Sequence, residues 1–358
     1  MHRRPTEREQ LRQLASSQDH ETALTQVTEL AQTTTDPLIH AMARATELLH
    51  ARNLGRVQRA LIVGAELAAA VQALDPQALG DRRDVAILVN GLRNAVIAAL
   101  DTPEVPIAAI DALLAEHADL LARVGCKPYA NLVLLAHRHE VAGERERIPE
   151  ILETLTPHIN YGNAEREHLG CPGCIRGLLA SYLEPDTSPE FLAEWLQPVL
   201  SGSGIYPNET VKPWQPGCYN SSSHLHLARS LLWHGQLAEA DIRGTGCADK
   251  DLDPCYLVPT IFYLELAMAL RKEPWIRDRI ALLRPRALRH EDINEAMLGA
   301  VRCAQAMAQI DLGTADERDE LWAFARRCAE RLDVRLARPR HVAFVEHERI
   351  AGPPFMRA

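Results

Sequence analysis

Reactive side chains crowd together at one place in the sequence, the stretch His-Leu-Gly-Cys-Pro-Gly-Cys that runs from residue 168 to residue 174. Thiolate sulfur and imidazole nitrogen are ligands that zinc prefers, and a structural zinc ion takes four of them at about 2.0 to 2.3 Å. The tight Cys-Pro-Gly-Cys turn can bring two thiolates to one ion, and a neighbouring hairpin can supply another. The predicted zinc ligands are His168, Cys171, Cys174 and Cys218, with His224 or His226 as substitutes.

The cysteines have other interpretations. Typical zinc modules carry two Cys-x-x-Cys pairs, whereas this chain has one. The thiols can instead serve as small buried hydrophobic groups where helices pack closely, or as a redox dithiol, although the strand-rich setting of thioredoxins is absent. Cys218 and His224 would suit a nucleophile and its base, but no third group or oxyanion site accompanies them. Phosphate-binding glycine loops and other catalytic motifs are missing as well. The sequence therefore leans away from an enzyme.

The composition is that of an ordinary globular protein. The chain has 358 residues, of which 47% are hydrophobic and 24% charged, enough for two domains or one elongated array. A net charge of -9 without any long run of Lys and Arg argues against nucleic-acid binding. No window approaches the roughly 18 apolar residues of a membrane helix, and the N-terminus has no apolar segment. We therefore expect a cytoplasmic protein with mostly reduced cysteines, which binds neither nucleic acid nor membrane.

Helix-period segments rich in Ala, Leu, Glu and Arg dominate the chain, while strand signals are scarce. Thr6–Ser17 with His20–Thr33, and Leu38–Ala51 with Arg56–Ala73, read as the first two helix pairs. Breaks recur roughly every 36 to 49 residues, near Asp19, Gly55, Thr102, Gly143, Asp186, Gly235, Glu273 and Gly313. Such a period is typical of stacked helical hairpins. The sequence predicts an all-α fold, a right-handed α-solenoid of about eight stacked antiparallel hairpins.

One unit carries a recognisable repeat pattern. Leu227–Ala240 has a small residue on its first helix, a Gly at the turn and Glu-Ala opening its second helix, and in this it resembles a tetratricopeptide repeat. Leu48–Ala60 is a looser example. Small side chains let paired helices approach, and Gly ends the first helix in a left-handed cap. The resemblance is to the tetratricopeptide-like class as a whole. It implies a scaffold whose concave groove, lined by first helices, holds an extended peptide or a partner's helix.

The predicted repeat architecture divides the chain into segments with different structures. We expect residues 1–350 to form a single repeat domain with an irregular loop insertion at residues 201–217, followed by an extended tail over residues 351–358. Val342–Val345 would be a short strand or a docked segment before that tail. The candidate groove residues are polar or aromatic groups in first helices, and each of them fits an ordinary solvated position equally well: Asn90, Asn94, Tyr129, Asn131, Arg138, Tyr219, Asn220 and Arg229.

Three functions fit these observations. The leading hypothesis is a scaffold that binds a peptide or protein partner in its groove. The first alternative is a zinc-binding protein or metalloenzyme centred on residues 168–174, with the loop Gly204–Gly217 as a lid. The second is a peptide-sensing regulatory subunit whose partner carries the DNA-binding part. Zinc is the one cofactor that the sequence suggests, and a homodimer is left open.

Overall fold

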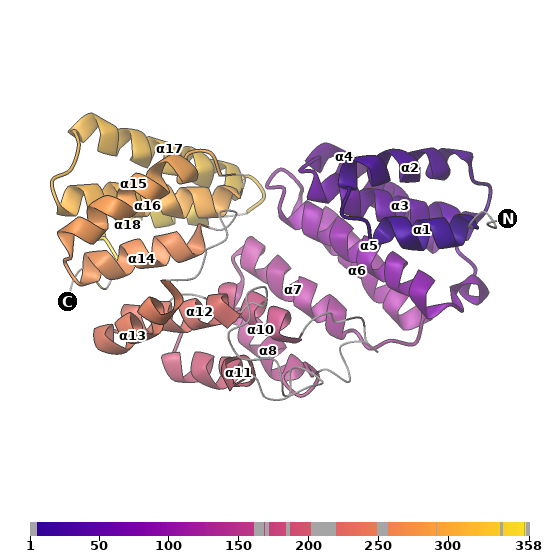
Figure 1. Cartoon of the computed structure of the whole chain (residues 1–358), viewed down its shortest axis with the longest axis horizontal. Coiled ribbons are helices and arrows are strands. Elements are labelled where there is room, and N and C mark those ends of the chain that lie inside the picture. The colour runs from indigo at the N-terminus through magenta and orange to yellow at the C-terminus, as the bar shows by residue number, and fades with distance from the viewer. Residues whose placement is uncertain are drawn as a thin grey trace. The chain divides into compact units, whose positions relative to one another are not determined.

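The computed structural model describes residues 6–160, 168, 172–183, 187–201, 220–248, 257–290, 292–336, 339–353 and 355. Within these ranges the chain forms helices joined by turns, and they contain no strand (Figure 1). The all-α prediction is therefore confirmed. No helix in the described ranges is long and apolar enough to cross a membrane.

The chain divides into two compact units. Unit 1 consists of Met1–Val141, Pro149–His158 and Gly162–Gly170, and unit 2 of Ala142–Ile148, Ile159–Tyr161 and Cys171–Ala358. The single domain over residues 1–350 stays a prediction. The loop insertion predicted at residues 201–217 lies, apart from Ser201 at the end of a helix, outside the described residues.

Unit 1 is built around two neighbouring helices, α3 and α5. Its helices are α1 (Glu7–Ala15), α2 (His20–Thr33), α3 (Pro37–Asn53), α4 (Val57–Gln72), the one-turn η1 (Pro76–Leu79), α5 (Arg82–Leu100), α6 (Ile107–Arg123), α7 (Tyr129–Ala142) and α8 (Ile148–Leu155). The one-turn η2 (Arg145–Arg147) lies between α7 and α8 in sequence and belongs to unit 2. Helix α3 packs against α1, α2, α4 and α5, while α4 contacts α6. Leu48, Leu67, Leu88 and Leu92 are fully buried between them. The helix pairs predicted over residues 6–73 are confirmed.

Unit 2 repeats the same kind of neighbour pattern. Its helices are α10 (Pro172–Ser181), α11 (Pro189–Ser201), α12 (Asn220–Trp233), α13 (Leu237–Ala248), α14 (Val258–Ala269), α15 (Glu273–Ala287), α16 (Ile293–Gln309), α17 (Ala315–Asp333) and α18 (Arg340–Ala351). Alternate helices α10, α12, α14, α16 and α18 contact one another in succession, and each of the first four contacts the helix that follows it. Val342–Val345 lies inside α18, so the prediction of a short strand there was wrong.

Several of the turns between helices share one backbone geometry. Gly235 has a φ of 74°, its N–H donates to the carbonyl of Leu232 at 3.1 Å, and the N–H of Gln236 donates to that of Leu231 at 2.9 Å. This pair of bonds satisfies carbonyls that the helix end leaves open. The same pair of bonds occurs at Gly55 after α3, at Gly125 after α6 and at Arg271 after α14. After α16, where Asp311 has the positive φ, the N–H of Leu312 donates to the carbonyl of Met307, which is the bond that spans five residues. The breaks predicted near Gly55 and Gly235 are confirmed.

Candidate functional site

A hollow of about 340 Å³ opens on unit 1, where α3 and α5 lie side by side. It is lined by Ala15, Ala45, Thr46, Leu49, Arg52, Ile87, Asn90, Gly91, Arg93, Asn94 and Ile97. The two helices approach so closely that a Cβ added at Gly91 would lie 2.5 Å from the Cβ of Ala45, far inside van der Waals contact. The small side chains at these two positions therefore allow the approach of α3 to α5, which positions the lining residues.

Two of the predicted groove residues lie in this hollow. Asn90 is exposed, and Asn94 is half-buried one turn further along α5. Arg52 on α3 donates from Nη1 to Oδ1 of Asn94 at 2.9 Å, which orients that amide. Arg93 is a second cationic side chain in the lining, and none of the described lining residues is acidic. The hollow thus combines amide donors and acceptors with guanidinium groups, a set that can bind peptide backbone and carboxylate oxygens.

The other three predicted groove residues of unit 1 do not line the hollow. Arg138 forms a two-point ion pair with Asp111, with N···O distances of 2.8 and 3.1 Å. Tyr129 stacks on the ring of His158, with ring centroids 4.0 Å apart. Asn131 accepts a hydrogen bond on Oδ1 from a histidine of α6. The structure therefore gives all three side chains partners within their own unit.

The histidine bonded to Asn131 is His117, which is fully buried. Its Nδ1 lies 2.9 Å from Oδ1 of Asn131, and its Nε2 has no partner among the described residues. Burial is the main reason why the pKa of His117 is lowered to about 4, and the charge of Arg93 lowers this pKa further. The ring is therefore neutral at pH 7, with Nδ1 as the donor toward the amide oxygen.

In unit 2, half-buried Arg229 belongs to a row of charged residues whose other three members are buried. Its Nε and Nη2 donate to the carboxylate of Glu265 at 2.8 and 2.9 Å. Glu265 also accepts from Nε of Arg302 at 2.7 Å, and Nη1 of Arg302 donates to Glu348. We call these four residues the charge ladder, because α12, α14, α16 and α18 each supply one of them. Tyr219 lies outside the described residues, as does the side chain of Asn220.

The ladder is electrostatically balanced. Burial alone would raise the pKa of Glu265, but Arg229 and Arg302 outweigh it and hold this pKa below its usual range. Burial would by itself lower the pKa of Arg302, but the carboxylates of Glu265 and Glu348 outweigh it and raise this pKa above its usual value. One signal for this row exists in the sequence: residues of alternating charge recur at 265 − 229 = 36, 302 − 265 = 37 and 348 − 302 = 46 residues, close to the spacing of the predicted breaks.

The predicted zinc ligands are only partly described. Cys171 and Cys218 lie outside the described residues, while His168 belongs to unit 1 and Cys174 to unit 2. The described part of the chain contains no group of three or more His, Cys, Asp and Glu side chains suited to hold a metal ion. Zinc stays a prediction, and metal analysis of protein purified without chelator tests it: one equivalent is expected, and only traces would contradict it.

Two other cysteines serve as small buried groups in the helix packing, which was the alternative to metal binding. Cys303 on α16 and Cys328 on α17 are both buried. Burial raises the pKa of Cys303 to about 12 and raises the pKa of Cys328 as well. Thiols in such surroundings stay protonated and behave as small hydrophobic groups.

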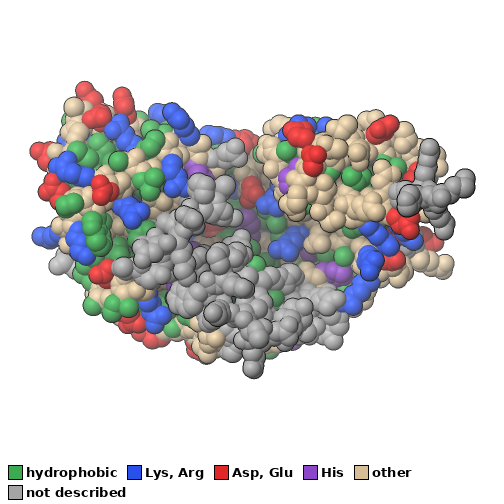
Figure 2. Space-filling model, in the orientation of Figure 1, with side chains coloured by type: hydrophobic (Ala, Val, Ile, Leu, Met, Phe, Trp, Pro, Cys, Tyr) green, Lys and Arg blue, Asp and Glu red, His purple; other side chains and the backbone are tan. Residues whose placement is uncertain are grey.

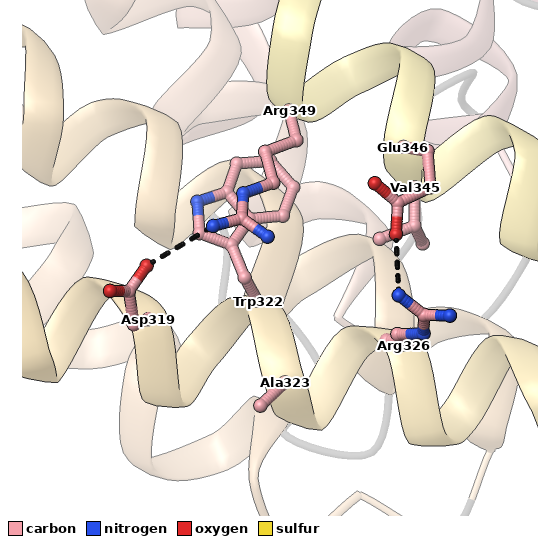
Figure 3. A pocket seen from close by; sticks show the side chains of 7 residues that line it. All are labelled: Asp319, Trp322, Ala323, Arg326, Val345, Glu346 and Arg349. Carbon is pink, nitrogen blue, oxygen red and sulfur yellow. Dashed lines mark hydrogen bonds and ion pairs between the residues drawn. The ribbon is translucent and has the colours of Figure 1, made fainter.

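A second hollow, of about 190 Å³, lies between α17 and α18 in unit 2 (Figure 3). Its charged side chains are paired, because Arg326 bonds Glu346 at 3.0 Å and Arg349 lies 3.5 Å from Asp319. Trp322 also lines it. On the face drawn in Figure 2, acidic and basic side chains are interspersed over unit 2 in the same way. The charged side chains of this hollow therefore already pair with one another.

Comparison with known proteins gives no precedent: no protein-family model matches the chain, and neither a curated protein nor a solved structure is similar to it. The hollow between α3 and α5 is the place where two predicted groove residues meet.

Proposed function

We propose that the protein is a scaffold of tetratricopeptide-like helical hairpins, stacked as a right-handed α-solenoid, which binds an extended peptide segment of a partner protein. The succession of contacts between alternate helices supports this architecture. Close approaches at small residues support it too, since a Cβ added at Gly64 on α4 would lie 3.0 Å from the Cβ of Ala95 on α5. Repeats of this kind present their first helices along one continuous face.

The hollow between α3 and α5 is the observation that carries the proposed binding. Asn90 and Asn94 are one helical turn apart, so both amides lie on the same face of α5. Four residues of α-helix rise by about 6 Å, and two residues of an extended peptide span about 6.6 Å. The two amides therefore match alternate residues of an extended peptide, whose backbone N–H and C=O groups they can bind.

The charges in the hollow select the kind of peptide. Arg52 and Arg93 both line it, and the described lining includes no acidic residue, although Arg52 also lies 3.7 Å from Asp101 outside the lining and the whole chain has a net charge of -9. A segment that carries Asp or Glu would pair with these guanidiniums. We therefore propose an acidic extended peptide as the ligand, with an affinity that falls as salt screens the charges.

A binding experiment tests this proposal. Short peptides are selected from a random display library on the purified protein, and their affinity is measured by fluorescence anisotropy at low and high salt. We expect acidic sequences, and a loss of at least about tenfold in affinity, or 1.4 kcal/mol, for Asn90→Ala combined with Asn94→Ala. Gln26→Ala removes an exposed amide from α2 and is the matched control.

The melting temperature of each variant shows whether a loss of affinity reflects binding or folding. Asn90 is exposed, and substitutions at such positions usually change stability by less than about 0.5 kcal/mol. If the selected peptides bind the double variant as tightly as the unchanged protein, the hollow is not the binding site and the proposal fails.

A further inference from the structure

Trp233, the last residue of α12, lies close to two arginines of the charge ladder. Its ring centroid is 5.9 Å from Cζ of Arg229 and 5.8 Å from Cζ of Arg302, within the range of cation–π attraction. Both guanidiniums are fixed by hydrogen bonds to the buried carboxylate of Glu265. Trp233 is therefore an aromatic platform whose surroundings are already ordered.

An aromatic side chain from beyond the last helix occupies one face of this platform. Helix α18 ends at Ala351, Gly352 takes a φ of 65°, and the chain then places Phe355 against Trp233. The ring centroids are 6.0 Å apart and the ring planes make an angle of 69°, an edge-to-face contact of the kind that aromatic pairs favour. Phe355 is only 7% exposed. The segment after α18 thus fills an aromatic position beside the charge ladder.

Trp233 and Arg302 each carry a buried hydrogen-bond donor that has no acceptor among the described residues. Nε1 of Trp233 and Nη2 of Arg302 are both buried, and no group in the described ranges accepts from either. Buried donors are normally paired in folded proteins, and those that are not call for an explanation. Phe355 has a hydrocarbon side chain, so its ring cannot accept either bond in the way an oxygen would. A carboxylate has two acceptor oxygens and would suit an indole N–H and a guanidinium N–H together.

We propose that Trp233 and Arg302 form a recognition site in unit 2 for a peptide segment that carries a phenylalanine with a carboxylate beside it. Phe355 occupies the aromatic half of this site from within the same chain. The inference goes beyond the proposed function, since it concerns other residues than those of the hollow between α3 and α5. A partner that supplies both the ring and the carboxylate makes bonds that Phe355 does not make. It therefore displaces the chain's own segment.

The occupation of this site by Phe355 of the same chain has a measurable consequence. A tethered segment acts at an effective concentration in the millimolar range, so a competing peptide binds only the fraction of molecules from which Phe355 has left. Its apparent affinity is reduced by that fraction. Removing Phe355 should therefore strengthen the binding of a peptide added from outside.

The experiment uses two forms of the protein, the full chain with Phe355→Ala and a chain that ends at Ala351. The probes are fluorescent, amidated peptides with the sequence of Gly352–Ala358, unchanged or with Pro354→Asp, Met356→Asp or Phe355→Ala. We expect the shortened chain to bind the unchanged peptide, and at least one Asp peptide to bind tenfold more tightly. The Phe355→Ala peptide should not bind. The unchanged full-length protein should bind each peptide at least tenfold more weakly than either altered form.

Trp233→Phe gives a test of the missing acceptor. This change removes the indole N–H but keeps an aromatic ring, so the preference for the Asp peptide should shrink while the unchanged peptide still binds. The proposal is overturned if the full chain with Phe355→Ala, folded by circular dichroism, binds neither Asp peptide. It is also overturned if neither Asp peptide binds more tightly than the unchanged one. The double variant Asn90→Ala with Asn94→Ala should bind these peptides as the unchanged protein does. A failure of the proposal for Trp233 and Arg302 is therefore distinguishable from a failure of the proposal for the hollow between α3 and α5.

Discussion

Asn131 shows how a single side chain on the expected face of a helix can acquire a structural partner. It lies on α7, where hairpin spacing placed it in a groove, but its Oδ1 accepts from buried His117 on α6 at 2.9 Å. The ring of His117 is fully buried, so its Nδ1 is shielded from solvent water. The amide of Asn131 therefore satisfies a donor that folding removes from solvent.

Replacing Asn131 with alanine should destabilise the protein. Asn131→Ala leaves a buried N–H without an acceptor, which typically costs about 1–3 kcal/mol. Urea unfolding measures this loss, with Gln26→Ala as a control whose exposed amide should matter little. A change below about 0.5 kcal/mol would mean that His117 finds another partner, and Asn131 would again be a candidate for ligand binding.

Acid should weaken the fold through His117. The pKa of this histidine is about 4 in the folded protein and about 6.5 in an unfolded chain. Above pH 6.5 both states are neutral and stability is complete. As the pH falls from about 6.5 to about 4, the unfolded state binds a proton that the folded state does not, so the free energy of unfolding falls. At about 1.4 kcal/mol per pKa unit, the total loss is roughly 3 kcal/mol.

Urea titrations at a series of pH values would measure this loss. Asn131→Asp offers a contrasting variant, because a carboxylate beside His117 favours the charged imidazole. In that variant the decline between pH 6.5 and pH 4 should be smaller than in the unchanged protein. Equal declines in both would show that another group is responsible.

At the scale of single elements, the turns after α12 and α14 allow a direct comparison. Both have the same two backbone hydrogen bonds and a residue with positive φ, which is Gly235 in one and Arg271, with a φ of 53°, in the other. Glycine adopts this conformation readily, whereas an L side chain is disfavoured there by about 1–2 kcal/mol. The backbone geometry of the second turn is therefore retained in spite of its residue.

Opposite substitutions at these two turns should have opposite effects. Arg271→Gly should stabilise the protein by about 0.5–1 kcal/mol, less than the full conformational cost because glycine also makes the unfolded chain more flexible. Gly235→Ala should destabilise it by about 1 kcal/mol, and since a Cβ there meets nothing within 4 Å, the cost would be that of the backbone alone. Thermal unfolding of both variants checks the pair. Changes of the same sign would contradict the explanation.

At the scale of the whole molecule, the charge ladder ties together helices that are far apart in the sequence. It connects α12 to α18 through ion pairs that are almost completely buried. A buried charge that loses its partner is left uncompensated, and such losses typically cost about 3–5 kcal/mol. The ladder is therefore expected to make unit 2 unfold as one cooperative body.

Glu265→Gln tests this cooperativity. The variant keeps the shape of the side chain but removes the negative charge between Arg229 and Arg302, so we expect a loss of about 3–5 kcal/mol. Glu239→Gln is the control, since its pair with Arg243 at 3.1 Å is exposed and worth less than about 1 kcal/mol. Differential scanning calorimetry separates the two, and a small effect of Glu265→Gln would show that the ladder is not a main tie within unit 2.

The sequence by itself determined the helices and several of the turns. Helix periodicity and the left-handed conformation at Gly55 and Gly235 depend on residues within a few positions of one another, so they can be read locally. Asn90 and Asn94 were predicted as groove residues because they are polar groups in a first helix, and their spacing of four places both side chains on one helix face.

Only the tertiary structure decided which side chains meet across helices. Asn131 and Arg138 carried the same signal as Asn90, but their partners come from α6, 14 and 27 residues away. The contact of Phe355 with Trp233 joins the end of the described chain to α12. A helix face specifies where a side chain points, whereas the packing of one helix on another specifies what it meets. That packing depends on small residues such as Ala45 and Gly91, whose effect appears only when the helices are brought together.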